Sequence, residues 1–344
     1  MPRTLARSHI ASLTALREAL APEIADLPRL SAMIDGFLAR GADSTASVGA
    51  ITAGLAAEPA LAAWVLRQAN SGYQGLARAV GDCGEACVVL GLEPVTRLVY
   101  AACSRDLLLY DPAPYPGPAR GPWLHGLATA AATTALARLL GVRSPLAPEA
   151  ARVAGLLHDA GKRLVAGRWP AGAGEAPATP AHERQRLGFD HAAASAALAR
   201  TWELPPAIVT AVANHHDPAP EGGAALVHAA DVLMNAWSVG AAPYPRPDAT
   251  PPHDELVGLV TRLGGDEDLV ARWCDALPPV ISGLDEMLRW SQRPSPPARP
   301  APDMPAASGA SGEPETDGSR TRRSRRSHER DRRSRRAGRR DRRR

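Results

Sequence analysis

The sequence of 344 residues predicts an all-α protein. It is rich in alanine and leucine, which are strong helix formers, and aromatic residues make up only 4% of it. Apolar residues recur at steps of three and four. No segment shows the sustained alternation of apolar and polar residues that is typical of a half-buried strand. Together these observations predict a bundle of many helices with little or no sheet.

Helix-breaking and helix-capping residues divide the first part of the chain. Pro22 is expected to end the first amphipathic helix, and Pro59 is well placed in the first turn of another. The sequence Asn70-Ser71-Gly72 predicts a turn. Helices are therefore expected at about 4–21, 27–40, 48–55, 59–70, 82–90 and 94–109.

A proline-rich segment separates this part from the next. Residues 111–122 contain five prolines and two glycines, so we interpret them as a linker. The linker would join an N-terminal helical part, 1–110, to a second helical subdomain, 123–290. A loop rich in glycine, alanine and proline is expected at 167–181. The helices of the second part are expected at about 123–140, 149–167, 190–202, 205–216, 224–239, 253–263, 266–276 and 278–290.

The last segment, 291–344, differs in composition and charge. It has almost no apolar residues to bury, which predicts a disordered tail. Its end, from Arg320 to Arg344, holds fifteen arginines and three acidic residues, a net charge of +12. Because the whole chain carries +4, the remainder carries −8. Such a tail can make weak, salt-dependent contacts with nucleic acid or an anionic surface, but it lacks the aromatic residues needed to stack bases.

Several observations predict a cytoplasmic protein. No apolar run approaches the length of a membrane span, and the residues after Met1 do not form a signal peptide. The four cysteines, Cys83, Cys87, Cys103 and Cys274, form no Cys-x-x-Cys pair. We interpret them as reduced, small apolar residues of the core.

The stretch from Gly155 to Lys162 holds the residues that are most informative about function. His158 and Asp159 are adjacent, and both can bind a metal ion. Lys162 is the only lysine of the chain, which suits a task that needs a compact ammonium group. The stretch is predicted to lie within the helix over 149–167. Taken alone, the His-Asp pair is more often a buried hydrogen-bonding or capping pair than a pair of ligands.

Further candidate ligands lie on separate predicted helices. Each of them alone has a structural interpretation, such as a polar helix end. Together with the His-Asp pair they offer nitrogen and oxygen ligands that suit one or two divalent transition metal ions, such as iron or manganese. These residues are His125, His191, His215, His216 and Asp231.

The order of these residues resembles that of the HD superfamily of metal-dependent phosphohydrolases. More closely, it resembles the HDOD branch, which is related to the HD-GYP cyclic-di-GMP phosphodiesterases. The resemblance covers about 24–240. It rests on Leu27-Pro28, Glu58-Pro59-Ala60-Leu61, Asn70-Ser71, Leu90-Gly91, Trp123-Leu124-His125, Gly155 to Lys162, Glu183, Gly188, His191, Trp202-Glu203-Leu204-Pro205 and His215-His216.

The resemblance implies a multi-helix, HD-like bundle and a role for each candidate. His125, His158, Asp159 and Asp231 would form the basic metal site, and His191, His215 and His216 would extend it to a second ion. Asp159 and Lys162 would take part in catalysis, with Lys162 contacting a phosphate oxygen. The Gly-Tyr-Pro triad of HD-GYP proteins is absent from the loop after His216, 217–223.

Two functions remain open at this stage. The resemblance favours a regulatory module of bacterial signal transduction that acts as a platform for signalling proteins or for a nucleotide, with or without metal. The alternative is a metal-dependent phosphohydrolase, such as a nucleotide or cyclic dinucleotide phosphodiesterase, that uses the retained ligands. Nucleic-acid binding through the tail is a third, accessory hypothesis.

Overall fold

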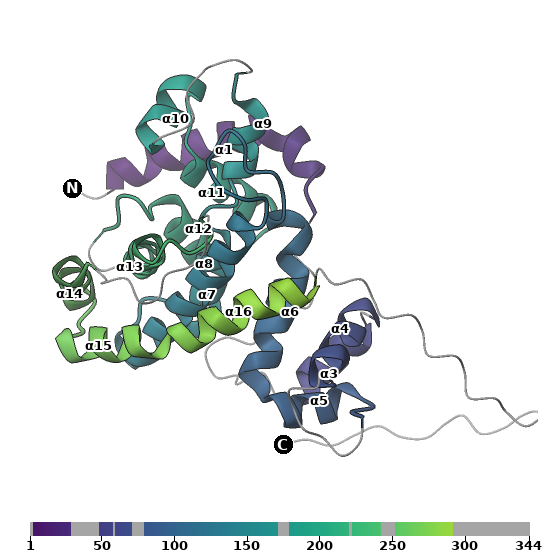
Figure 1. The fold of residues 1–344 in the computed structure, drawn as a ribbon. Coiled ribbons are helices and arrows are strands. Elements are labelled where there is room, and N and C mark those ends of the chain that lie inside the picture. The colour runs from purple at the N-terminus through teal and green to yellow at the C-terminus, as the bar shows by residue number, and fades with distance from the viewer. Residues whose placement is uncertain are drawn as a thin grey trace, which may run out of the picture. The chain divides into compact units, whose positions relative to one another are not determined.

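The computed structural model describes residues 3–28, 48–57, 59–70, 79–170, 179–219, 222–241 and 252–291. Every regular element in these ranges is a helix (Figure 1), which confirms the predicted all-α class. These ranges all lie within one compact unit, 1–293. The helix predicted at 27–40 lies almost entirely outside the described residues, as does the predicted tail from 292 onward.

The helices before the proline-rich segment follow the predicted breaks closely. Helix α1 is the exception, because it continues through Pro22 to Ala25. A proline removes only one backbone donor, and the buried Ile24 holds the last turn against the core. The helices of this part are α1 (Arg3–Ala25), α3 (Val48–Ala57), α4 (Pro59–Ala69), α5 (Cys83–Leu90) and α6 (Leu92–Leu108).

The second part contains the remaining helices. They are α7 (Gly121–Leu140), the short 3₁₀ helix η2 (Gly141–Arg143), α8 (Pro148–Leu157), α9 (Lys162–Arg168), α10 (Pro180–Leu187), α11 (His191–Thr201), α12 (Pro206–Ala213), α13 (Gly223–Ala236), α14 (His253–Arg262), α15 (Glu267–Ala276) and α16 (Pro278–Ser291).

Helix α7 is the centre of the core. It is buried along nearly its whole length and packs against α6, α8, α13, α15 and α16. Two tryptophans fix it by hydrogen bonds as well as by packing. Trp123 of α7 donates its indole N–H to Ala101 O at 3.1 Å, and Trp273 of α15 donates to Ala132 O at 2.9 Å. Both indoles are fully buried, so each needs such a partner.

Helices α7 and α8 lie side by side (Figure 1), and small residues allow their backbones to come very close. A Cβ atom on Gly155 would lie 2.5 Å from Thr133 Oγ1 and 2.8 Å from Thr129 O. A Cβ atom on Gly126 would lie 3.0 Å from Leu156 O. This close contact brings His125, next to Gly126, near the end of α8, where His158 follows.

The single helix predicted over 149–167 is wrong, because the chain breaks between α8 and α9 at 158–161. There the backbone makes i−3 hydrogen bonds, from Lys162 N to Asp159 O at 2.9 Å, for example. Gly161 also approaches α11, where its N–H donates to Ser195 Oγ at 2.7 Å. The tight turn aligns Asp159 with Lys162, because residues three apart eclipse in a 3₁₀ turn.

Helix α10 is absent from the sequence prediction, which placed a loop through 181 and no helix before 190. Thr179 caps its start by accepting a hydrogen bond from His182 N at 3.2 Å, and Pro180 is its first residue. Gly188 ends it in the left-handed conformation, with φ of 80°. These are ordinary start and stop signals, but the segment has few apolar residues that would mark a helix by periodicity.

A buried arginine ties the two parts together. Arg152 of α8 is only 1% exposed and pairs with Glu93 of α6 at 3.0 Å and with Glu149 at 3.3 Å. Tyr100 of α6 donates its hydroxyl to Glu149 at 3.1 Å. A buried guanidinium needs such partners, so this network fixes α8 against α6.

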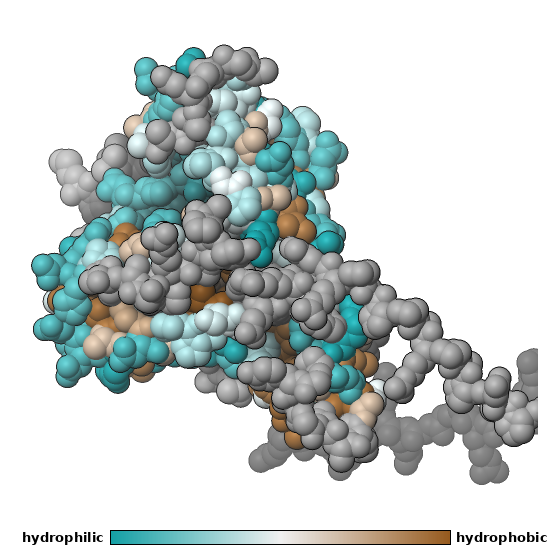
Figure 2. All heavy atoms as spheres, in the orientation of Figure 1, coloured by the Kyte–Doolittle hydropathy of each residue, from teal (hydrophilic) through white to brown (hydrophobic). Residues whose placement is uncertain are grey.

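The described residues contain no single helix that could span a membrane, and they contain no disulfide. No single described helix is long and apolar enough to cross a membrane. Taken together, α5 and α6 are long and apolar enough, but the chain bends by 117° between them. The four cysteines all lie in the described ranges, and none of them forms a disulfide. On the face drawn in Figure 2, hydrophilic residues predominate around α1, α9 and α10, and hydrophobic residues gather lower down, around α3 to α5 and α14.

We expect Gly161→Ala to lower the free energy of unfolding by about 2–4 kcal/mol, because the close approach of Gly161 to α11 leaves no room for a methyl group. A Cβ atom there would lie 2.2 Å from His191 O and 2.5 Å from Ser195 N. Urea denaturation measures the change. Gly167→Ala in α9 is the matched control, since its Cβ would meet nothing within 4 Å. It should leave stability equal or slightly higher. Equal stability of the two variants would contradict the proposed role of the Gly161 contact.

Candidate metal centre

The structure brings all seven predicted ligands together in two neighbouring groups. Within each group, one potential ligand atom from every member lies within 4.8 Å of those of the others. The side chains come from α7, the turn after α8, the start of α11, the turn after α12 and the middle of α13. The first group is His125, His158 and Asp231, and the second is Asp159, His191, His215 and His216.

The first group is a nearly regular triangle of ligand atoms. Nε2 of His125 lies 3.2 Å from Nε2 of His158 and 3.1 Å from Oδ1 of Asp231. Nε2 of His158 lies 3.5 Å from the same oxygen. Two ligand atoms about 2.1 Å from one ion, at tetrahedral or octahedral angles, are about 3.0–3.4 Å apart. The triangle therefore has the dimensions of one face of a metal site.

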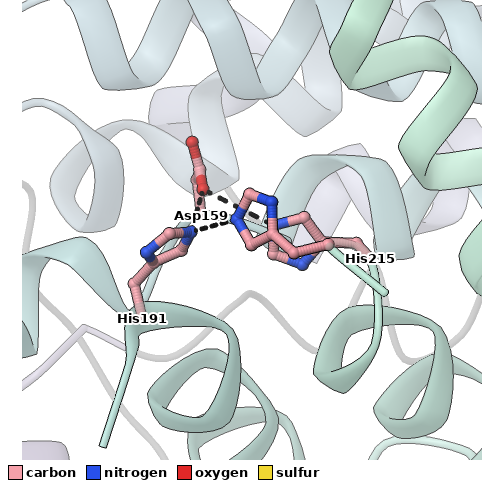
Figure 3. Close-up of side chains that lie close together, drawn as sticks. Asp159, His191 and His215 are labelled. Carbon is pink, nitrogen blue, oxygen red and sulfur yellow. Dashed lines mark hydrogen bonds and ion pairs between the residues drawn. The ribbon is translucent and has the colours of Figure 1, made fainter. Parts of the chain in front are cut away.

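The second group is wider. His191 and His215 point from different elements toward the carboxylate of Asp159 (Figure 3). Oδ1 of Asp159 lies 3.2 Å from Nε2 of His191 and 3.9 Å from Nε2 of His215. Nε2 of His216 lies 2.7 Å from Nε2 of His191, and the His216 side chain is partly exposed to solvent. This group therefore has an open side at His216.

The carboxylate of Asp159 faces both groups. Its Oδ1 atom points to the second group, while its Oδ2 atom lies 3.5 Å from Nε2 of His158 and 3.7 Å from Nε2 of His125. Nζ of Lys162 pairs with Oδ2 at 2.5 Å. Asp159 is thus the one side chain of the described site whose two oxygens can serve two ions.

The histidines are oriented by contacts on their other ring nitrogen. Nδ1 of His125 faces Val239 O at 3.2 Å, Nδ1 of His158 faces Gly155 O at 2.8 Å, and Nδ1 of His215 faces Val212 O at 2.8 Å. A carbonyl oxygen only accepts, so each Nδ1 carries the proton. Each Nε2 can then present its lone pair to the site, which is the usual support for metal-binding histidines.

The turn after α13 holds Val239 in place for His125. Gly240 has φ of 89°, and a Cβ atom there would lie 2.6 Å from Gly121 O and 2.9 Å from His125 Cβ. Only glycine allows the end of α13 to approach the start of α7 this closely. Asp231, on the same helix, is also held by Asn235, whose amide donates to Oδ1 at 2.8 Å.

The two carboxylates are ionised in this environment. Burial by itself would raise the pKa of Asp159, but the charges of Lys162 and His158 hold it well below its usual value. Burial opposes ionisation of Asp231 as well, and contacts with His125 and His158 lower its pKa well below the ordinary range. Ionised carboxylates are the form that binds a cation.

The histidines of the second group differ in charge. Burial lowers the pKa of His215 well below its usual value. Partial burial of the His216 ring, together with the nearby charge of His191, lowers the pKa of His216 to about 4, so both rings are neutral at pH 7. Burial also disfavours the charged form of His191, but its carboxylate neighbours, Asp159 and Glu183, outweigh that effect and raise its pKa to about 9. A proton on His191 therefore takes the place of a cation, and binding of an ion would release it.

Two buried atoms indicate that the second group fits a metal ion. Within the described part of the chain, Nε2 of His215 has no hydrogen-bond partner, and Oδ1 of Asp159 has none besides its ion pair with His191 at 3.2 Å. Such atoms are costly to bury unless they are paired or metal-bound. Both face the same space, and together with His191 and His216 they offer three nitrogens and one oxygen, a donor set suited to zinc, iron or manganese.

Two residues that support the site were not among the predicted site residues, although Glu183 is one of the residues that carry the family resemblance. Glu183 of α10 accepts from His191 N at 2.7 Å and contacts its Nδ1 at 2.7 Å. Tyr115, in the predicted linker, donates its hydroxyl to Glu183 at 2.7 Å. Its ring lies 5.7 Å from Nζ of Lys162. The start and stop signals of α10 could have located Glu183, but no local signal marks Tyr115.

The comparison with protein families shows to which family this chain belongs. A model of the HDOD domain matches residues 27–218, more than half of the chain. The chain belongs to the HDOD family. The match confirms the resemblance that the sequence motifs predicted. It begins after α1 and ends before Asp231 on α13. Among curated proteins, none matches the chain significantly.

Solved structures agree with membership of the HDOD family. An HDOD domain protein of unknown function from Geobacter sulfurreducens has a TM-score of 0.60 and 22% identity, covering 81% of this chain and 99% of its own. A suggested phosphohydrolase from Shewanella amazonensis SB2B has a TM-score of 0.54 and 26% identity, with coverages of 78% and 98%. A suggested signal transduction protein from Marinobacter aquaeolei VT8 has a TM-score of 0.60 and 21% identity, with coverages of 83% and 66%.

We expect Glu183→Gln to weaken transition-metal binding at the second group by about 10–100-fold, because the neutral amide orients His191 less firmly. Titration of manganese into metal-free protein, followed by calorimetry, measures the affinity. Glu255→Gln on α14 is the control and should bind as the wild type does. An unchanged affinity in Glu183→Gln would show that Glu183 does not support the site.

Proposed function

We propose that this HDOD protein is a metal-dependent phosphohydrolase of a signalling system, with one ion in each ligand group. One observation carries the proposal: two groups of candidate ligands lie side by side, and the carboxylate of Asp159 faces both of them. Two adjacent ions can clamp the attacking and leaving oxygens of a phosphoester. The expected ions are divalent transition metals such as iron or manganese.

The protein's own residues provide binding and orientation. Bound divalent ions supply Lewis acidity and generate the attacking nucleophile at neutral pH. Lys162 would contact a phosphate oxygen; its 31% exposed side chain and the pairing of its ammonium group with Asp159 support this role. Asp159 would hold an ion of each group through its two carboxylate oxygens. Exposed His216 lies where a substrate could enter.

The geometry favours hydrolysis over a platform without catalysis. A platform does not need seven ligands, and it does not need backbone and carboxylate partners that orient each ring. The similarity to the suggested phosphohydrolase from Shewanella amazonensis, at 26% identity, also supports a hydrolytic function. A regulatory role in bacterial signalling, with signalling proteins or a nucleotide as partners, remains part of the proposal and would be served by the same site.

The metal content of the purified full-length protein tests the two groups separately. We expect up to two equivalents of transition metal in protein purified without chelator, measured by mass spectrometry. His125→Ala should lose the ion of the first group, and His215→Ala the ion of the second. Asp159→Ala should lose both. The control is His253→Ala on exposed α14, which should keep both ions. Full metal content in all variants would refute the proposed ligands.

A measurement of catalytic turnover distinguishes an enzyme from a binding platform without catalysis. We expect the manganese-loaded protein to hydrolyse bis(p-nitrophenyl) phosphate, and Asp159→Ala to abolish the activity. Lys162→Met should keep its metal and lose at least about 100-fold in kcat, because it removes one positive charge from the developing phosphate charge. Release of p-nitrophenol is measured by absorbance. A metal-loaded protein without turnover on phosphoesters would favour the platform instead.

A further inference from the structure

A cavity adjoins the open side of the second ligand group. Its volume is about 710 Å³, and it lies among α1, α10, α11 and the turn after α12. His216 is part of its wall, and Nε2 of His216 is 2.7 Å from Nε2 of His191. A molecule bound at the ligand groups could therefore extend past His216 into this space.

One wall of the cavity comes from outside the matched family domain. Leu13 and Leu16 of α1 line the cavity, and the family match begins only at residue 27. The remainder of α1 is firmly attached, because Leu20 and Ile24 are buried. Figure 1 shows α1 beside α11, against which it packs.

Polar contacts hold the same helix in place. Arg168 of α9 donates to Ala19 O at 2.6 Å and pairs with Glu23 at 2.6 Å. Because α1 is fixed to both α9 and α11, the two leucines are held at a set distance from the opposite wall. That wall includes Ala192 and Ala193 of α11, whose small side chains leave the space open.

The chemistry of the lining suits an uncharged organic group better than a phosphate. The leucines and alanines make two apolar walls, and Asn214 and Asp217 offer hydrogen-bonding atoms at the edge. Arg184, the arginine in the described lining, is already paired with Asp190. The described lining therefore has no free guanidinium for a phosphate. The volume lies in the range of small-ligand pockets, about 300–1,000 Å³.

We propose that this cavity binds the organic group esterified to the phosphate, an uncharged and largely apolar group with hydrogen-bond donors at its edge. Leu13 and Leu16 set the size of the group that is accepted. The proposal rests on the proposed function, since the phosphate itself would lie at the ligand groups. Helix α1 is then a specificity element of this protein and not only an N-terminal extension.

Two phosphonates test the proposal without hydrolysis. Methylphosphonate and benzylphosphonate carry the same charged oxygens, and they differ only in the organic group. We expect the manganese-loaded full-length protein to bind benzylphosphonate about tenfold more tightly, because one ring is buried in the cavity. Leu16→Trp fills the cavity from α1, and Ala193→Leu fills it from α11. Both should abolish this preference and keep the affinity for methylphosphonate.

The control is Ala15→Trp, at an exposed position of the same helix, which should keep the preference. Metal content and melting temperature are measured for every variant. Equal affinity of the wild type for the two phosphonates would overturn the proposed subsite alone. So would a preference that persists in both cavity-filling variants. A metal-loaded wild type that binds neither phosphonate would overturn the proposed function, and the subsite with it.

Discussion

The carboxylate of Asp159 imposes the constraint on which the site depends. A buried carboxylate is costly unless positive charge and donors surround it, so several helices must present such groups at one point. Lys162 supplies a fixed charge, and the histidines of both groups supply rings that can accept a cation or a proton. This demand for positive charge also raises the pKa of His191, because the carboxylates of Asp159 and Glu183 favour its charged form. A metal ion bound there would satisfy the same demand more fully.

Close backbone contacts make this convergence physically achievable. Gly155 lets α8 approach α7, Gly161 lets the following turn approach α11, and Gly240 lets the end of α13 approach the start of α7. Each contact lies within a few residues of a candidate ligand. The glycines are therefore as necessary to the geometry as the histidines, because a side chain at any of these points would separate two ligand-bearing elements.

Two segments that the sequence does not connect with the candidate ligands contribute to the site and its surroundings. Tyr115, within the predicted linker, bonds to Glu183, which orients His191. Helix α1, before the matched domain, supplies a wall of the neighbouring cavity. The candidate ligands define what chemistry the proposed centre could perform, whereas these flanking segments support the ligands and line the space beside them.

The sequence alone determined the helical class, most helix ends and the identity of all seven candidate ligands, because periodicity, capping residues and ligand chemistry are local properties. It did not determine the break after His158, the helix that carries Glu183, or the shared position of Asp159 between two groups. Those features arise from contacts between distant segments, such as Gly161 with Ser195. Only the tertiary structure decides them, since no local pattern records which backbones must touch.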